Sequence, residues 1–280
     1  MKTIVIFAIK GGVGKSTVTA GLGTALRDNG FRIGFADFDY YGSNLPTALG
    51  IPEPFPYVEL DTAREKMLAV KINGYEIFSL SFRFGKAALI WEGGEQKVTV
   101  FGQEFILHGT GTYELVKQMI SNVEFSQCDY LLLDMPPSSG DITLSLFENI
   151  SELWGIILVC QPTNLAVQDI ERTLNMMEVK RLPLLGMVGN MSYAIAPKSK
   201  EEFFPFLDAG VDLEGFCNQR GIPYLASIPL TPEKELIDSK FQRMAEKVIA
   251  AAPVRIWQKS FKQRVEEATV KGIVKGLFRG

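Results

Sequence analysis

Residues 9–17 combine the side chains and the spacing that bind a polyphosphate. They read Ile-Lys-Gly-Gly-Val-Gly-Lys-Ser-Thr and lie between an apolar run at 3–8 and a segment of helical periodicity. The glycines allow the backbone to turn successive N–H groups onto phosphate oxygens. Lys15 adds a mobile cation, and the Ser16 hydroxyl is placed to bind Mg²⁺. The predicted nucleoside triphosphate site consists of Gly11, Gly12, Val13, Gly14, Lys15, Ser16 and Thr17.

Three carboxylates follow apolar runs and are candidates for the magnesium chemistry of such a site. Asp37 and Asp39 close one run, and Asp134 ends the run 130–133. Ligands bind at the carboxyl edge of parallel sheets, and a period of two directs Asp37 and Asp39 the same way. Because Mg²⁺ prefers oxygen ligands, one of these two would hold the metal's shell while the other orients the water that attacks the γ-phosphate. We expect Asp134 to hold Mg²⁺ through water, as at the end of a Walker B strand.

The elements that must position these residues are short apolar runs alternating with longer segments of helical period. This pattern predicts an α/β fold with a mostly parallel, doubly wound sheet and helices on both faces. The helix after the glycine-rich loop should run from Ser16 to Asp28 and end at Asn29-Gly30, a pair that tolerates the left-handed conformation. The expected strands lie near 3–9, 32–36, 75–80, 130–134, 155–160, 185–190 and 224–227.

A change of period to two over 97–107 predicts a β-hairpin insertion at about 95–108, with Gly102 in its turn. Such a ribbon either covers a sheet edge or forms a docking surface. We favour the first interpretation because the sequence shows no signal for a partner.

Composition bounds the kind of protein. The 280 residues can bury one large α/β core, and we expect a nucleotide-binding domain over 1–252 and a tail over 253–280. A net charge of −3 creates no general attraction to nucleic acid, and we expect no specific nucleic-acid partner. The three cysteines lie far apart, which argues for a reducing compartment and against disulfides. No segment reaches the ~20 apolar residues of a membrane span, so we expect a cytoplasmic protein.

The loop also carries a deviation that narrows its class. Ile9 stands where the usual G-x-x-x-x-G-K-[ST] spacing has glycine, and Lys10 is an additional lysine. The segment resembles the K-G-G-x-G-K-[ST] motif of the ParA, MinD, nitrogenase iron protein and Mrp ATPases. Five further segments resemble the Mrp-type branch of iron–sulfur carriers, in the right order and over about residues 1–245: Asp37–Pro46, Trp91–Gly93, Asp134–Asp141, Asn190–Tyr193 and Ile228–Leu230.

This resemblance implies a homodimer in which Lys10 reaches across to the partner's nucleotide. It assigns Asp37 to the metal side and Asp39 to the attacking water, so the expected catalytic residues are Lys10, Lys15 and Asp39, and the metal residues are Ser16, Asp37 and Asp134. It also places Asn190 and Pro229 at the nucleotide. An Asn side chain offers adenine both a donor and an acceptor, although a loop-capping role fits Asn190 about as well.

One departure concerns the metal cluster of this branch. The family carries C-P-x-C about three residues after its N-M-S-Y motif, a pair that joins its dimer mate to hold a bridging cluster, whereas this chain reads Ala196-Pro197-Lys198-Ser199. Alanine offers no ligand and serine a poor one for a soft iron–sulfur site. We therefore expect no iron–sulfur cluster at this position. Cys217 could replace the pair only if the fold brought it to the dimer axis.

The tail differs from the body because residues 254–280 contain seven basic and two acidic side chains. Apolar residues from Val270 to Phe278 form a helical stripe, and a basic amphipathic helix can lie on an anionic membrane. The segment 269–280 also resembles the membrane-targeting tail of MinD. Gly272 and Gly276 each cost ~1 kcal/mol in helix propensity, and a helix packed on the protein or its dimer mate fits equally well.

The function expected from these residues is that of a slow, dimer-activated, Mg²⁺-dependent ATPase that switches an unknown client protein. One alternative is a scaffold or chaperone for an iron–sulfur or other metal cofactor, which the absent cysteine pair weakens. The other is a positioning ATPase on the inner face of the membrane or on the nucleoid, which the tail supports and the Mrp-like body opposes.

Overall fold

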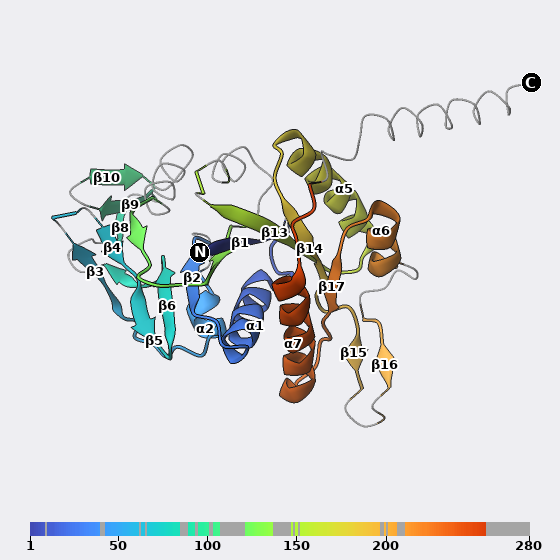
Figure 1. Cartoon of the computed structure of the whole chain (residues 1–280). Coiled ribbons are helices and arrows are strands. Elements are labelled where there is room, and N and C mark those ends of the chain that lie inside the picture. The colour runs from blue at the N-terminus through green and yellow to red at the C-terminus, as the bar shows by residue number, and fades with distance from the viewer. Residues whose placement is uncertain are drawn as a thin grey trace, which may run out of the picture.

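The chain folds around one eight-stranded sheet (Figure 1). The computed structural model describes residues 1–8, 10–39, 43–61, 63–64, 66–84, 89–92, 95–100, 103–106, 121–136, 147, 149–150, 152–196, 199, 201–205 and 211–255. In spatial order the sheet contains β17 (Tyr224–Ser227), β14 (Leu184–Gly189), β13 (Leu153–Cys160), β1 (Lys2–Phe7), β12 (Tyr130–Asp134), β2 (Ile33–Asp37), β6 (Tyr75–Ser79) and β5 (Val70–Ile72).

Neighbouring strands of this sheet pair in parallel, except for β5, which runs antiparallel to β6 at the edge. All described residues of β2, β12 and β14 are buried. Strands covered on both faces must be apolar throughout, which is why their sequences show continuous hydrophobic runs rather than alternation. The mostly parallel α/β architecture predicted from the sequence is confirmed.

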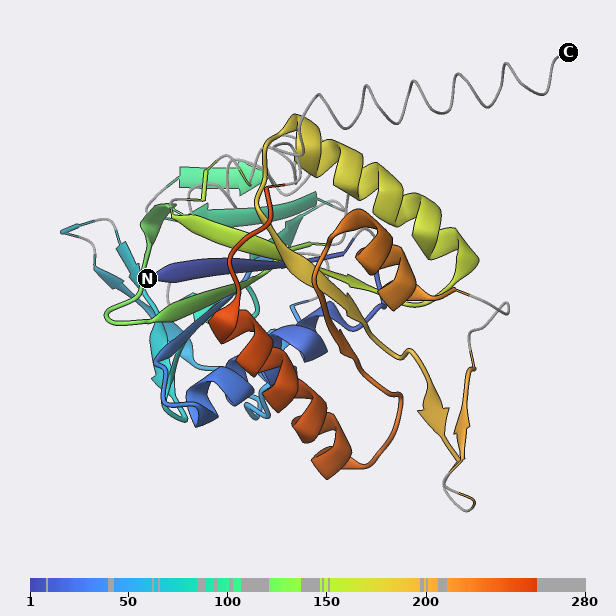
Figure 2. The ribbon, with the colours of Figure 1, turned by 45° about the vertical axis from the view of Figure 1, so that its right-hand side comes forward.

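Helices cover both faces of the sheet (Figure 2). On one face α1 (Lys15–Asp28) packs beside α7 (Lys234–Ala250), and on the other lie α5 (Asn164–Val179) and α6 (Leu213–Arg220). A short helix, α2 (Leu45–Ala48), follows β2. This division follows from right-handed crossovers, because the chain moves in opposite directions along the sheet after β1 and after β13.

The first helix sits close to the sheet because one of its residues has no side chain. A Cβ at Gly23 would overlap the ring of Phe35 in β2 and a methyl group of Leu132 in β12. The helix begins at Lys15 and ends at Asp28, with Asn29 and Gly30 at its end and Gly30 at a φ of 89°. The predicted bounds are therefore confirmed to within one residue.

Smaller sheets flank the central one. One contains β11 (Val123–Glu124), β4 (Lys66–Leu68), β3 (Tyr57–Asp61) and β7 (Arg83–Phe84), and another contains β15 (Ala194–Ile195) and β16 (Glu202–Phe203). The predicted hairpin is confirmed as β9 (Glu95–Val100) paired with β10 (Gln103–Ile106), and β8 (Leu89–Glu92) adds a third strand to it. The strands of these smaller sheets that the sequence did not predict have five residues or fewer, which is too few for a clear hydrophobic periodicity.

The end of the described chain returns to the central sheet. Val254 exchanges two backbone hydrogen bonds with Leu184 of β14, at 2.7 and 3.0 Å. The described chain is therefore paired with the central sheet as far as this residue, and the domain boundary at 252 stays a prediction. Residues 256–280, which contain the predicted amphipathic segment, lie outside the described part of the chain. Among the residues described, no helix is both long and apolar enough to span a bilayer.

Candidate functional site

Three strand ends bring the predicted site residues to one place. In the sheet β1 lies between β13 and β12, and β12 pairs in turn with β2. The parallel register places Ile6 opposite Asp134 and Asp134 opposite Asp37. The glycine-rich loop after β1 and the carboxylates after β12 and β2 therefore share the carboxyl edge of the sheet, where ligands of such folds bind.

The glycine-rich loop has the backbone that the motif predicts. Gly12 and Gly14 have φ values of 78° and 81°, in the left-handed region that side chains with a Cβ rarely adopt. The loop encloses a cavity of about 350 Å³ that is lined by Lys10–Thr17, Asp39 and Asn44. The cavity opens at the start of α1, whose free N–H groups favour an anion.

One buried ammonium group links the acidic residues of this edge. Lys15 Nζ lies 2.7 Å from Asp134 Oδ1 and 3.1 Å from Asp39 Oδ2. Burial alone would lower the pKa of Lys15, but the attraction of Asp134 and Asp39 outweighs it and raises that pKa. Lys15 therefore keeps its positive charge in the described site, and its two ion pairs hold the ends of β2 and β12 together.

Asp37 lies one layer deeper than Asp39 and is fully buried. Its Oδ1 accepts the backbone N–H of Asp39, and its Oδ2 accepts the N–H of Leu45 and the hydroxyl of Ser79. Burial and the nearby Asp134 raise the pKa of Asp37 to about 8. Because both carboxylate oxygens already accept hydrogen bonds, Asp37 is better placed to hold Asp39 and the start of α2 than to bind a metal directly. Its predicted metal role stays a prediction.

Asp134 has the features of a metal-site carboxylate. It is fully buried, and its Oδ2 has no hydrogen-bond partner among the described residues. Burial raises its pKa, while Lys15 and a hydrogen bond from Ser16 act in the opposite direction. A buried carboxylate oxygen without a partner beside a hydroxyl fits the oxygen donors and water shell that Mg²⁺ prefers.

Asn190 follows β14 and braces the glycine-rich loop. Its Nδ2 donates to the carbonyl oxygen of Val13 over 2.8 Å, and a Cβ at Gly14 would overlap that amide. Gly14 therefore has two reasons to be glycine, its φ and this close approach. Asn190 and Pro229 do not line the cavity of the loop, and their assignment to the nucleotide base stays a prediction.

Asn44 is a cavity residue that the motif analysis did not single out. It stands immediately before α2 and lines the cavity together with Asp39. Its position depends on Asp37, whose carboxylate holds the N–H of the next residue, Leu45. The segment 37–46 resembles a switch motif, and among its described residues the fold places Asp39 and Asn44 at the cavity.

Lys10 stands at the rim of the same edge. Its side chain is half exposed, and Nζ lies 2.8 Å from Asp169 Oδ2 of α5, in the same chain. The structure therefore brings Lys15, Ser16, Asp39 and Asp134 together and leaves Lys10 at the periphery. Its predicted reach into a partner subunit stays a prediction.

The segment that replaces the family's cysteine pair begins where the hairpin strand β15 ends. Ala196 bonds to Glu201 through its backbone, and the exposed Ser199 lies in the turn before β16. Cys217 is fully buried in α6, with Sγ 3.7 Å from the sulfur of Met187, and burial raises the pKa of its thiol to about 11. The structure thus places Cys217 in the core of its own subunit. Among described residues, no group of three or more His, Cys, Asp or Glu side chains could hold a metal.

The whole nucleotide site lies within a region that matches a known protein family. The family model of ParA, described as the NUBPL iron-transfer P-loop NTPase, matches residues 1–267. The chain belongs to this family. Membership in the ParA family confirms the class inferred from the additional lysine and the Mrp-like segments.

Curated relatives in this part of the ParA family are named as iron–sulfur proteins. The iron-sulfur cluster carrier protein of Aquifex aeolicus is 30% identical over 226 residues, which cover 80% of this chain and 56% of the relative. The carrier protein of Methanocaldococcus jannaschii is 31% identical over 81% of this chain and 72% of its own length. The chain thus spans little more than half of the Aquifex relative.

Solved structures show the same ParA-type fold. A nucleotide-binding protein from Archaeoglobus fulgidus in complex with ADP has a TM-score of 0.60 and 23% identity, and the match covers 93% of this chain and 91% of that one. The septum site-determining protein MinD from Pyrococcus horikoshii, complexed with Mg-ADP, has a TM-score of 0.57 and 19% identity, with 88% and 95% covered.

The contact between Asn190 and the loop predicts the behaviour of an Asn190→Ala variant. Losing the amide frees the Val13 carbonyl and loosens Gly14, so affinity should fall about tenfold for Mg·ATP and Mg·GTP alike. Calorimetric titration of both nucleotides measures this, with Asn218→Ala on α6 as a control. A loss confined to ATP would instead assign Asn190 to the adenine base.

Proposed function

We propose that this protein is a Mg²⁺-dependent ATPase that works as a homodimeric switch. The convergence of Lys15, Asp39 and Asp134 beneath the glycine-rich loop carries the proposal. Membership in a family of P-loop NTPases and the nucleotide-bound structural neighbours support it.

The resting site has to rearrange when a nucleotide enters. The loop N–H groups would bind phosphate oxygens, and Lys15 would move from Asp39 and Asp134 toward the phosphates. Asp39 then becomes available to orient the attacking water, while Asp37 keeps its backbone in place. Ser16 and Asp134 would hold Mg²⁺, which supplies positive charge against the β- and γ-phosphates. In this scheme the same cation that recognises the phosphate also releases the catalytic carboxylate.

The second subunit supplies the charge that a single site lacks. Among the described residues, Lys10 and Lys15 are the basic side chains that line the cavity, and Lys10 is paired with Asp169 of α5. A lysine contributed by the partner would stabilise the charge that develops on the transferred phosphoryl group. Turnover should therefore be slow and should rise with protein concentration.

Three substitutions test this scheme. Lys15→Ala should remove nucleotide binding, whereas Lys10→Ala and Asp39→Ala should bind Mg·ATP with an affinity within about threefold of the original chain and hydrolyse it at least about a hundredfold more slowly. Calorimetry and phosphate release measure the two effects, and Lys71→Ala on the exposed edge is the matched control. Normal turnover in Asp39→Ala would refute its role.

An iron–sulfur carrier is the second candidate function, because the curated relatives are named for it. The cytosolic Fe-S cluster assembly factor CFD1 of Eremothecium gossypii is also similar, with 29% identity over 86% of this chain. Ala196 and Ser199 supply no thiolate, so we propose that this chain serves a client without carrying a cluster between those two positions.

Metal analysis separates the two functions. After anaerobic purification and reconstitution with iron and sulfide, the protein should contain less than about one iron per ten chains. The double variant Ala196→Cys with Ser199→Cys, treated identically, should bind iron and show thiolate-to-iron absorption. Stoichiometric iron in the original chain would overturn the assignment.

The basic tail supports a reversible membrane role for the same switch. We propose that the protein is cytoplasmic and that residues 269–280 bind the anionic inner face of the membrane when ATP closes the dimer, because two weak anchors act together in a dimer. The client protein would then be met at the membrane surface.

Truncation tests the membrane role directly. Removing residues 269–280 should abolish sedimentation with anionic liposomes in the presence of ATP and leave hydrolysis unchanged. Neutral liposomes are the control for charge. If the full-length protein never sediments with anionic liposomes, the tail has another role.

A further inference from the structure

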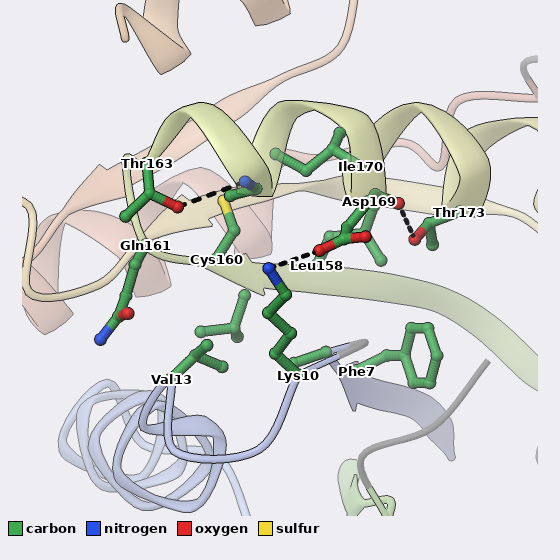
Figure 3. A pocket seen from close by; sticks show the side chains of 13 residues that line it. Phe7, Lys10, Val13, Leu158, Cys160, Gln161, Thr163, Asp169, Ile170 and Thr173 are labelled. Carbon is green, nitrogen blue, oxygen red and sulfur yellow. Dashed lines mark hydrogen bonds and ion pairs between the residues drawn. The ribbon is translucent and has the colours of Figure 1, made fainter. Parts of the chain in front are cut away.

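The additional lysine of the loop is held inside its own subunit. Figure 3 shows Lys10 extending toward α5, where its Nζ lies 2.8 Å from Asp169 Oδ2. The lysine side chain is 49% exposed, but that of Asp169 is only 18% exposed. The carboxylate is therefore the fixed member of the pair, and the lysine is the mobile one.

The surroundings stabilise this resting position. The Lys10 side chain borders a small cavity of about 50 Å³ between the loop, β13 and α5, and Asp169 lies at the same cavity (Figure 3). The walls are mainly apolar and include Phe7, Val13, Leu158, Cys160, Ala166 and Ile170. A wall of low polarity on one side strengthens the ion pair, and the methylene groups of the lysine gain contacts there.

Asp169 also has a second cation within reach. Arg172 Nη1 lies 3.7 Å from Asp169 Oδ1, one turn further along α5. When Lys10 leaves, Arg172 can move closer to the Asp169 carboxylate and pair with it. The exchange therefore leaves no partly buried charge without a partner. With Arg172 in this position, breaking the Lys10–Asp169 ion pair costs only a moderate amount of free energy.

We propose that Asp169 is a positioning residue that stores Lys10 in the separate subunit and sets the protein concentration at which the dimer forms. The inference rests on the proposed function, in which Lys10 acts on the partner's nucleotide. Each subunit must break its own Lys10–Asp169 pair before it can donate the lysine, so a closed dimer costs two such pairs. Asp169 thus opposes premature closure without touching the nucleotide.

The test measures dimer formation by analytical ultracentrifugation with Mg²⁺ and a non-hydrolysable ATP analogue. Asp169→Asn should lower the dimer dissociation constant at least about fivefold, because two ion pairs no longer oppose closure. The protein concentration for half-maximal ATPase activity should fall by the same factor, with maximal turnover unchanged. Asp169→Glu should restore the original values, and Asp169→Ala provides a second loss of charge should the asparagine variant fold poorly.

Two further variants separate storage from a general effect on α5. Glu171→Gln removes a charge from the same helix, where Glu171 pairs with Arg220, and it should leave the dissociation constant unchanged. In a Lys10→Ala background, Asp169→Asn should have no effect on dimerisation. An unchanged dissociation constant in Asp169→Asn, or an equal shift in the Lys10→Ala background, overturns the inference alone. If the original chain shows neither dimer nor concentration-dependent turnover, the proposed function fails first.

Discussion

The structure depends on one buried ammonium group shared by the carboxylates of two strand ends. Lys15 pairs with Asp39 after β2 and with Asp134 at the end of β12, and both acids lie at the carboxyl edge of the sheet. Carboxylates this deeply buried repel one another and lose hydration, which is why the pKa values of Asp37 and Asp134 are raised. Without a cation the edge would be strained by its own charge. Lys15 supplies that cation, and a metal ion bound with a nucleotide would reduce the remaining repulsion between the carboxylates.

Both functional lysines are held by carboxylates of the same chain. Lys15 is held within the cavity by Asp39 and Asp134, and Lys10 is held at its rim by Asp169 of α5. In the proposed switch, phosphate would draw Lys15 from its acids within one subunit, whereas Lys10 would leave Asp169 only for the nucleotide of a second subunit. The proposed switch therefore has two thresholds of different kinds, nucleotide occupancy for one lysine and protein concentration for the other.

The chain has the glycine-rich loop expected of its P-loop NTPase family, and it departs from the resembled motif at the expected position of cluster ligands. The glycine-rich loop and the strand order agree with the P-loop NTPase family that the chain belongs to, whereas the hairpin after β14 carries Ala196 and Ser199 where the resemblance implies a cysteine pair. In the proposed function the two roles are separable, because the phosphate site lies at the sheet edge next to β1, whereas a cluster site would lie on the hairpin of β15 and β16.

The sequence by itself determined the features that depend on neighbours along the chain. The loop at 9–17, the acids that end apolar runs, the first helix and the long buried strands each carry a complete signal within a few residues, because backbone freedom and hydrophobic periodicity are local properties. Only the tertiary structure decided which distant groups meet. Asn190 reaches Val13 across 177 positions of sequence, and Asp169 reaches Lys10 from another helix. Likewise, the separation of Asp37 from Asp39 into a supporting and a cavity-lining position depends on Leu45 and Ser79. These partners follow from how the helices and strand ends pack in three dimensions, and no spacing along the chain encodes that packing.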